Sequence, residues 1–481
     1  MEIQLLINNE DVPAANGATF ERHNPITGSL VTRAAAATVE DAKAAVDAAA
    51  AAFPAWSSLG PNDRRQLLLK AAQLLLDKSA EFARLMTQET GGTPGWGYFN
   101  VKIAAGMLQE AASMTTQITG EVIPSDNPTV MAMAIRQPVG VVFSMAPWNA
   151  PVILGVRSIA MPLACGNTVV MKASEFSPAT HLLIGQVMRE AGFPAGVVNV
   201  LTHAPADASA IVETAIAHPA VRRINFTGST RVGRIIAQTA AKYLKPVLLE
   251  LGGKAPLVVL DDADLDEAVH AAAFGAFMHQ GQICMSTERI VVDEAVADAF
   301  VAKLAAKAAS LPAGDPSGDV VLGSLVSCEA AERVEALIRD AVDKGAKLVA
   351  GGSRNGAIMP ATVLDRVTPE MRIYTEESFG PVVAVIRVRG DEEAIRVAND
   401  TEYGLSSAVF SRNIPRALNV AKRIDAGICH INGTTVDDEP QMPFGGVKGS
   451  GYGRFGGKAA INEFTELRWI TVATGPQRYP F

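Results

Sequence analysis

The chain has 481 residues, which is too long for one hydrophobic core and predicts two or three domains. Its hydrophobic content of 48% and charged content of 19% are typical of a globular protein. A formal net charge of −8 argues against a nucleic-acid partner, and no apolar run is long enough to span a membrane.

The first hundred residues are predicted to be rich in helix. Residues 41–53 are dense in alanine, and residues 64–90 carry apolar side chains at helical spacing. Residues 119–137 are rich in β-formers, methionine and turn residues, and they predict a hairpin that leaves the domain.

From residue 139 onward, apolar strand-like runs alternate with amphipathic helical segments, which implies doubly wound parallel sheets. A first series comprises residues 140–146, 168–172, 197–201, 222–226 and 247–250. A second series, and so a second α/β domain, comprises residues 256–260, 289–292, 346–350, 382–387, 407–410 and 428–432. A last strand is predicted over residues 463–473.

Two local sequences suggest covalent chemistry. Cys284 ends the sequence QGQIC (280–284), and Glu250 begins the sequence ELGGK (250–254). A thiolate is the nucleophilic form of cysteine, and a covalent intermediate needs a second group that activates water for its release. His279 also lies near Cys284 in sequence, but His279 and Lys254 are expected to be structural or solvated.

Three further sequences follow predicted strands and are ambiguous when taken singly. Asn149 in PWN (147–149) is a neutral donor suited to an oxyanion, but it could equally cap a helix starting near Pro151. The turn GSTRVG (228–233) opens a helix and suits a phosphate, yet many glycine-rich turns bind nothing. Lys172 and Glu175 lie in a loop that is either solvated or close to a ribose.

These motifs, with ESFGPV (377–382) and PFGGVKGSG (443–451), occur in the order and at about the spacing of one family. Over roughly residues 20–470 the chain resembles the NAD(P)-dependent aldehyde dehydrogenase superfamily. The resemblance implies an α/β fold with a Rossmann-type cofactor domain (1–118 and 138–250) and an α/β catalytic domain (251–430). Residues 119–137 and 431–481 would form the oligomerisation hairpin, the active-site loop and the C-terminal strand of a homodimer or homotetramer.

The resemblance also assigns roles to residues. Cys284 would be the nucleophile, and Asn149 would donate a hydrogen bond to the oxyanion. Glu250 would be the base that activates water, and its presence favours water over coenzyme A as the acceptor of the acyl group. The implied cofactor-binding residues are Trp148, Lys172, Glu175, Gly228, Ser229, Gly233, Leu251, Glu377 and Phe379. The carboxylate of Glu175 would disfavour a 2′-phosphate, so NAD is expected to be preferred and NADP to be accepted less well.

The substrate prediction rests on residues 146–157, which resemble the subgroup acting on hydroxylated or methoxylated benzaldehydes such as vanillin and salicylaldehyde. The implied substrate-binding residues are Trp96, Val152, Ile153, Arg157, Ile283, Met285, Phe444 and Tyr452. Arg157 also permits an alternative, because succinate-semialdehyde dehydrogenases carry an arginine at the matching position. A thiol hydrolase or a non-catalytic binding protein is a further alternative.

The setting expected is a reducing cytoplasm. The N-terminus lacks the apolar core of a signal peptide, and the four cysteines are too few and scattered for a disulfide framework. There is no Cys-x-x-Cys and no His/Cys cluster, so no metal site is predicted.

Overall fold

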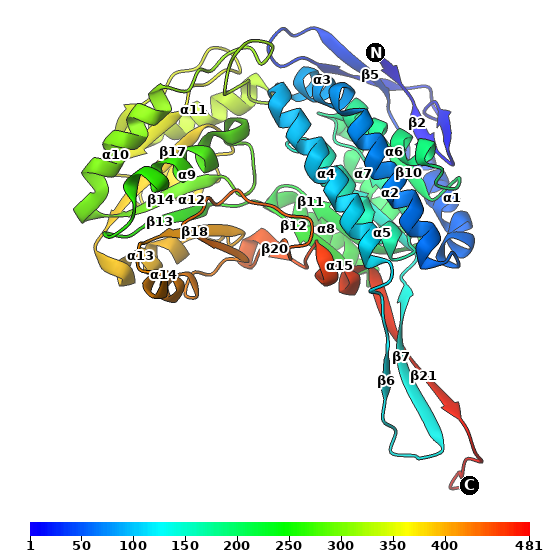
Figure 1. Cartoon of the computed structure of the whole chain (residues 1–481). Helices are drawn as coiled ribbons and strands as arrows, with labels where there is room; N and C mark the ends of the chain where they lie inside the picture. The colour runs from blue at the N-terminus through cyan, green and yellow to red at the C-terminus, as the bar shows by residue number, and fades with distance from the viewer.

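A computed structural model describes all 481 residues and confirms the α/β fold. Two large, mostly parallel sheets form the two lobes of the body, and a narrow antiparallel sheet projects away from it (Figure 1). A small sheet in the order β1-β5-β4 consists of β1 (Glu2–Ile3), β5 (Leu30–Ala35) and β4 (Thr19–His23). No helix is long and apolar enough to cross a membrane.

The first large sheet has eight strands in the order β20-β12-β11-β8-β9-β10-β2-β3. Its strands are β2 (Leu5–Ile7), β3 (Glu10–Val12), β8 (Val141–Met145), β9 (Thr168–Lys172), β10 (Val198–Leu201), β11 (Val221–Thr227), β12 (Val247–Glu250) and β20 (Gly451–Tyr452). The helices of this lobe are α1 (Val39–Ser57), α2 (Pro61–Asp77), α3 (Ser79–Thr90), α4 (Pro94–Met114), α5 (Pro151–Ala164), α6 (Pro178–Ala191), α7 (Ala208–Ala217), α8 (Thr230–Lys242) and α15 (Gly457–Phe464).

Both faces of this sheet are buried. Along β8, Val141 and Phe143 pack into the core shared with α1 and α7, whereas Val142 packs into the core shared with α5 and α6. Successive strand residues point to opposite faces, so an unbroken apolar run is what a strand covered on both sides requires.

The second large sheet has seven strands in the order β15-β16-β17-β14-β13-β18-β19. Its strands are β13 (Ala255–Val259), β14 (Thr287–Asp293), β15 (Lys347–Ala350), β16 (Thr362–Asp365), β17 (Val382–Val388), β18 (Ser406–Phe410) and β19 (Ile428–Ile431). Its helices are α9 (Leu265–Phe277), α10 (Glu294–Ala309), α11 (Cys328–Asp343), α12 (Arg372–Thr375), α13 (Gly390–Asn399) and α14 (Ile414–Ala421).

The sheets change over between β12 and β13. We propose that the predicted boundary between the two domains, between residues 250 and 251, lies at this change of sheet. β20 joins the first sheet although it lies near the end of the chain, and it pairs antiparallel with β12.

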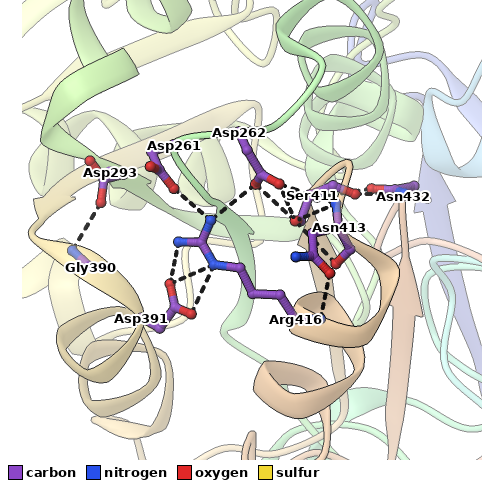
Figure 2. Close-up of polar contacts among 9 residues, drawn as sticks. All are labelled: Asp261, Asp262, Asp293, Gly390, Asp391, Ser411, Asn413, Arg416 and Asn432. Carbon is purple, nitrogen blue, oxygen red and sulfur yellow. Dashed lines mark hydrogen bonds and ion pairs between the residues drawn. The ribbon is translucent and has the colours of Figure 1, made fainter.

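A cluster of charged groups closes the carboxyl end of β13 (Figure 2). Arg416 of α14 forms ion pairs with Asp261 and Asp262, which follow β13, and with Asp391 of α13; the nitrogen–oxygen distances are 2.7, 3.3 and 2.5 Å. Ser411 donates a hydrogen bond to Asp262 at 2.8 Å. The cluster therefore ties two helices to one strand end.

The projecting sheet has the order β21-β7-β6 and consists of β6 (Glu121–Ile123), β7 (Val130–Pro138) and β21 (Thr465–Ala473). β21 pairs with β7 along its whole length, from Thr465 opposite Pro138 to Ala473 opposite Val130. Val122, Leu467 and Trp469 are among its exposed side chains. The predicted hairpin and the last predicted strand therefore form one sheet.

Some elements differ from the sequence predictions. The apolar pattern over residues 64–90 is two helices, because the backbone leaves the helical conformation at Lys78 and α3 begins at Ser79. The strands β1 to β5, β16 and β20 were not predicted; β4 and β5 have five and six residues, and each of the others has only two to four. Segments this short show no periodicity that would separate a strand from a loop.

Candidate active site

The site lies where the carboxyl ends of the first sheet face the amino end of β14. Glu250 is the last residue of β12, Asn149 follows β8, and Cys284 lies between α9 and β14. Ligands of open α/β sheets bind at such carboxyl ends. The two lobes thus each contribute part of the site.

A cavity of about 480 Å³ opens at Cys284. Its lining is mainly apolar and aromatic and consists of Trp96, Phe99, Ile103, Asn149, Ala150, Ile153, Leu154, Arg157, Phe274, Met278, Ile283, Cys284, Met285, Gly433, Thr434, Val436, Asp437, Asp438 and Phe444. The size and character of this lining suit a small organic molecule with a ring.

The backbone before Cys284 is tightly folded. His279 and Gln280 adopt left-handed φ values of 48° and 56°, and Gly281 follows at 69°. A Cβ on Gly281 would lie 2.1 Å from the carbonyl oxygen of Gly380, so glycine is required there. Burial, together with the nearby Glu250, raises the pKa of the Cys284 thiol to about 12.

Glu250 is a buried carboxyl group without partners. The side chain is almost fully enclosed, and neither carboxyl oxygen has a hydrogen-bond partner. Burial raises its pKa well above the usual value, and the charges of Arg157 and Arg454 oppose that rise. A buried carboxyl group with a raised pKa and no hydrogen-bond partner is a candidate for a general base.

Asn149 is fixed beside the cysteine loop. Its side-chain Nδ2 donates to the backbone carbonyl oxygen of Gln282 at 2.9 Å, and the backbone carbonyl oxygen of Asn149 accepts from Nε1 of Trp96 at 3.0 Å. The helix-cap alternative is wrong, because Ala150 is the N-cap of α5 and no side chain caps that helix.

His279 and Lys254 have the structural environments expected of them. The ring of His279 stacks on Trp96 at 4.7 Å between centroids, and burial lowers its pKa to about 3. Lys254 is buried in an ion pair with Glu288 at 2.6 Å. Glu288 also accepts hydrogen bonds from the backbone N–H groups of Ser378 and Phe379, so this pair anchors the 377–382 segment.

Six of the eight predicted substrate-binding residues line the cavity: Trp96, Ile153, Arg157, Ile283, Met285 and Phe444. Two predictions are corrected. Val152 is fully buried in the core, because it faces away from the cavity on α5. Tyr452 is half exposed and pairs with Leu249, so its side chain lies on the face of the sheet opposite to Glu250.

The cavity also contains residues that were not singled out. Phe99 and Phe274 add aromatic surface, and Asp438 forms an ion pair with Arg157. The Arg157 guanidinium also lies over the Phe444 ring, 4.0 Å from its centroid. The helical spacing of Phe99 and Trp96 was a signal for Phe99, and Asp438 lies in the 436–444 loop that the resemblance placed at the substrate tunnel; Phe274 had no signal.

A second, larger hollow of about 720 Å³ lies against the first sheet. Four of the predicted cofactor-binding residues line it: Trp148, Lys172, Glu175 and Ser229. Lys172 lies 2.6 Å from Nε2 of His203, and burial lowers its pKa to about 8. Ser229 caps α8, whose N-terminus therefore faces the hollow and favours a phosphate.

The other five predicted cofactor residues lie outside the lining of that hollow. A Cβ on Gly233 would lie 2.4 Å from Leu251, and one on Gly228 would lie 2.4 Å from Phe226, so both glycines permit close packing behind the turn. Glu377 accepts from the N–H of Gly253 at 2.8 Å, and burial raises its pKa to about 7.

The Phe379 ring meets the ring of Trp148, which lines the hollow, edge-on at 5.8 Å between centroids. Cations, a capped helix N-terminus and aromatic rings are the groups that a dinucleotide needs, so the residues present fit such a cofactor.

Residues 12–470 match the aldehyde dehydrogenase family, and the chain belongs to that family of NAD(P)-dependent enzymes. It is 63% identical over 481 residues to the vanillin dehydrogenase of Pseudomonas fluorescens, covering 100% of both chains. It is 40% identical over 470 residues to the NAD(+) benzaldehyde dehydrogenase of Pseudomonas putida, covering 97% of this chain and 96% of the relative. The crystal structure of a salicylaldehyde dehydrogenase from Pseudomonas putida G7 complexed with salicylaldehyde matches with a TM-score of 0.98 at 54% identity, over 100% of both chains.

Proposed function

We propose that the protein oxidises a hydroxylated or methoxylated benzaldehyde, of the vanillin or salicylaldehyde type, to the carboxylic acid with NAD⁺. The apolar, aromatic cavity at Cys284 is the observation that carries this proposal. Burying a ring there gains on the order of 25 cal/mol per Å² of apolar area. The names of the similar proteins support the same class of substrate.

In the proposed mechanism, Cys284 loses its proton to solvent, and its sulfur attacks the aldehyde carbonyl to give a thiohemiacetal. Asn149 and the backbone N–H of Cys284 stabilise the oxyanion. Held near Lys172, Glu175 and Ser229, NAD⁺ would supply the acceptor for the hydride that leaves the former aldehyde carbon. The product left on Cys284 is a thioester.

Glu250 completes the reaction. Its unpartnered carboxylate takes a proton from water, which attacks the thioester and releases the acid and the Cys284 thiol. Glu250 packs closely against Gly445, where a Cβ would lie 2.7 Å from its Oε1. This glycine therefore preserves the position of the carboxyl group.

The same cavity disfavours succinate semialdehyde. Arg157 is the only cation in the lining, and it is already paired with Asp438. A substrate carboxylate would have to displace that partner and lose its own hydration.

The proposal also covers the preferred cofactor, the oligomeric state and the cellular location. Glu175 would repel a 2′-phosphate, which supports NAD over NADP. The projecting sheet supports a homodimer or homotetramer, and four unpaired cysteines support a cytoplasmic location.

A panel of aldehydes assayed by NADH absorbance at fixed NAD⁺ tests the substrate. We expect vanillin, salicylaldehyde and benzaldehyde to show higher kcat/KM than succinate semialdehyde or butanal. A best rate with succinate semialdehyde would reject the aromatic assignment. A thiol hydrolase would form no NADH, and a binding protein would form no product.

A further inference from the structure

Asp438 lies in the loop after β19 and reaches the wall of the Cys284 cavity. Its carboxylate accepts a hydrogen bond from Nη2 of Arg157, and the two side chains are only 13% and 6% exposed. Arg157 makes no other hydrogen bond within the protein, and its guanidinium rests on the Phe444 ring. The wall therefore holds one cation and one anion in contact.

This contact decides the charge that a substrate meets. Without a partner, the nearly buried guanidinium of Arg157 would attract an anion, because a buried cation gains most from an opposite charge. Paired with Asp438, it leaves the wall close to neutral while still offering one donor and one acceptor to an uncharged ring substituent. The other carboxylate of the lining, Asp437, is largely exposed and makes no contact with Arg157.

We propose that Asp438 determines the charge selectivity of the substrate site. By neutralising Arg157, it admits uncharged aromatic aldehydes and excludes aldehydes that carry a carboxylate. This inference rests on the proposed function and identifies a residue that controls which aldehydes that site accepts. Asp438 acts on the distal part of the substrate, not on the reacting atoms.

The test compares two aldehydes of the same shape, 4-carboxybenzaldehyde and 4-carbamoylbenzaldehyde, which differ in charge. In Asp438→Asn the amide still offers an oxygen to Arg157, but the negative charge is gone. We expect the acid-to-amide ratio of kcat/KM to rise about tenfold or more, mainly through a lower KM for the acid. The matched control is Asp437→Asn, for which the ratio should change less than twofold.

A double variant shows whether the gain comes from Arg157. In Arg157→Met/Asp438→Asn the gain for the acid should disappear. The proposal is overturned if Asp438→Asn oxidises the amide but keeps the wild-type ratio, if the gain survives without Arg157, or if Asp437→Asn gives the same gain.

A second variant keeps the test decisive if Asp438→Asn does not fold. Arg157→Met leaves the Asp438 charge unopposed, so the acid-to-amide ratio should fall below that of the wild type. An unchanged ratio in this variant contradicts the proposal.

The proposed aromatic substrate and the proposed role of Asp438 can be rejected independently of each other. Wild-type turnover of benzaldehyde against butanal tests the aromatic assignment. The same variants assayed with butanal and succinate semialdehyde test the charge effect even if the natural substrate is aliphatic. A raised preference for succinate semialdehyde in Asp438→Asn supports the role of Asp438 in that case, and an unchanged preference contradicts it.

Discussion

Burial sets the chemistry of the two central residues. Burial and the neighbouring Glu250 raise the pKa of Cys284 to about 12, and burial raises the pKa of Glu250 well above its usual value. Each must lose its proton to act in the proposed mechanism.

Glu250→Gln should stop the reaction after the first hydride transfer, because thioester hydrolysis needs a base. We expect one burst of NADH per active subunit, followed by steady-state turnover that is roughly 100-fold or more below the wild type. Stopped-flow absorbance measures both phases. Cys284→Ala is the control and should form no NADH while still binding NAD. Steady turnover near the wild-type rate in Glu250→Gln would mean that another base acts.

Wild-type turnover should rise with pH between about 7 and 9. Both raised pKa values have the same sign of effect, since higher pH increases the thiolate of Cys284 and the carboxylate of Glu250. The pre-steady-state burst of Glu250→Gln isolates the contribution of Cys284. A turnover that falls steadily across this range would contradict the assignment of these two groups.

Glu175 should influence cofactor choice through its charge. In Glu175→Gln we expect kcat/KM with NADP to improve relative to NAD by roughly fivefold, because a like-charge contact in partly solvated surroundings is worth about 1 kcal/mol. Glu213→Gln is the matched control, since Glu213 lines the same hollow and pairs with Lys242 at 3.8 Å. Equal ratios in the two variants would place Glu175 away from the ribose.

Sequence reasoning identified residues that lie within local motifs and missed those that meet only through the fold. Cys284, Glu250 and Asn149 each belong to a short, distinctive sequence. Asp438 contacts Arg157 from 281 positions away, and one sequence contains no signal for such a pair. Val152 was assigned to the cavity because it follows Asn149 closely, but the turn of α5 directs it into the core.

The predicted elements were most accurate where the apolar run was long. The strands buried on both faces, such as β8 and β9, appear close to their predicted positions. The strand β20 has two residues and exists only because β12 offers it a backbone edge. Short edge strands of this kind depend on tertiary contacts, so local pattern does not reveal them.

The Arg416 cluster joins α13 and α14 to the carboxyl end of β13, so its loss should loosen that end of the strand (Figure 2). Arg416→Met leaves several carboxylates without their cation, and we expect a lower stability of about 1 to 3 kcal/mol. In a thermal scan at fixed rate, the Tm should fall by roughly 2 to 8 °C.

The control for this change is Arg412→Met, whose side chain is mostly exposed and pairs only with Asp264. Its Tm should stay within about 1 °C of the wild type. Equal shifts in the two variants would show that the cluster adds nothing beyond a surface ion pair.

At the scale of the whole molecule, the projecting sheet carries apolar side chains that a monomer would leave in water. Trp469 is 78% exposed and Leu467 is 64% exposed on the same face of β21. Exposed apolar patches of this kind mark interaction surfaces. The sheet therefore supports the proposed homodimer or homotetramer, whose subunits would cover it.

Trp469→Lys should shift the protein toward smaller species, because a buried tryptophan at an interface is worth about 2 kcal/mol or more. Size-exclusion chromatography with light scattering measures the mass across a dilution series. The control is Leu348→Lys, an exposed leucine on the edge strand β15 of the second sheet. An unchanged mass for Trp469→Lys at all concentrations would assign the interface elsewhere.

The pairing of β20 with β12 also has a consequence during synthesis of the chain. Glu250 leaves the ribosome long before Gly451, and at about 5 to 20 residues per second the delay is roughly 10 to 40 s. Over that time one edge of the first sheet is open and Gly445 is not yet present to pack against the Glu250 carboxyl group. The nascent protein can thus complete much of its first large sheet before the Glu250 carboxyl group is enclosed, and a chain that ends before β20 would expose an unpaired strand to its neighbours.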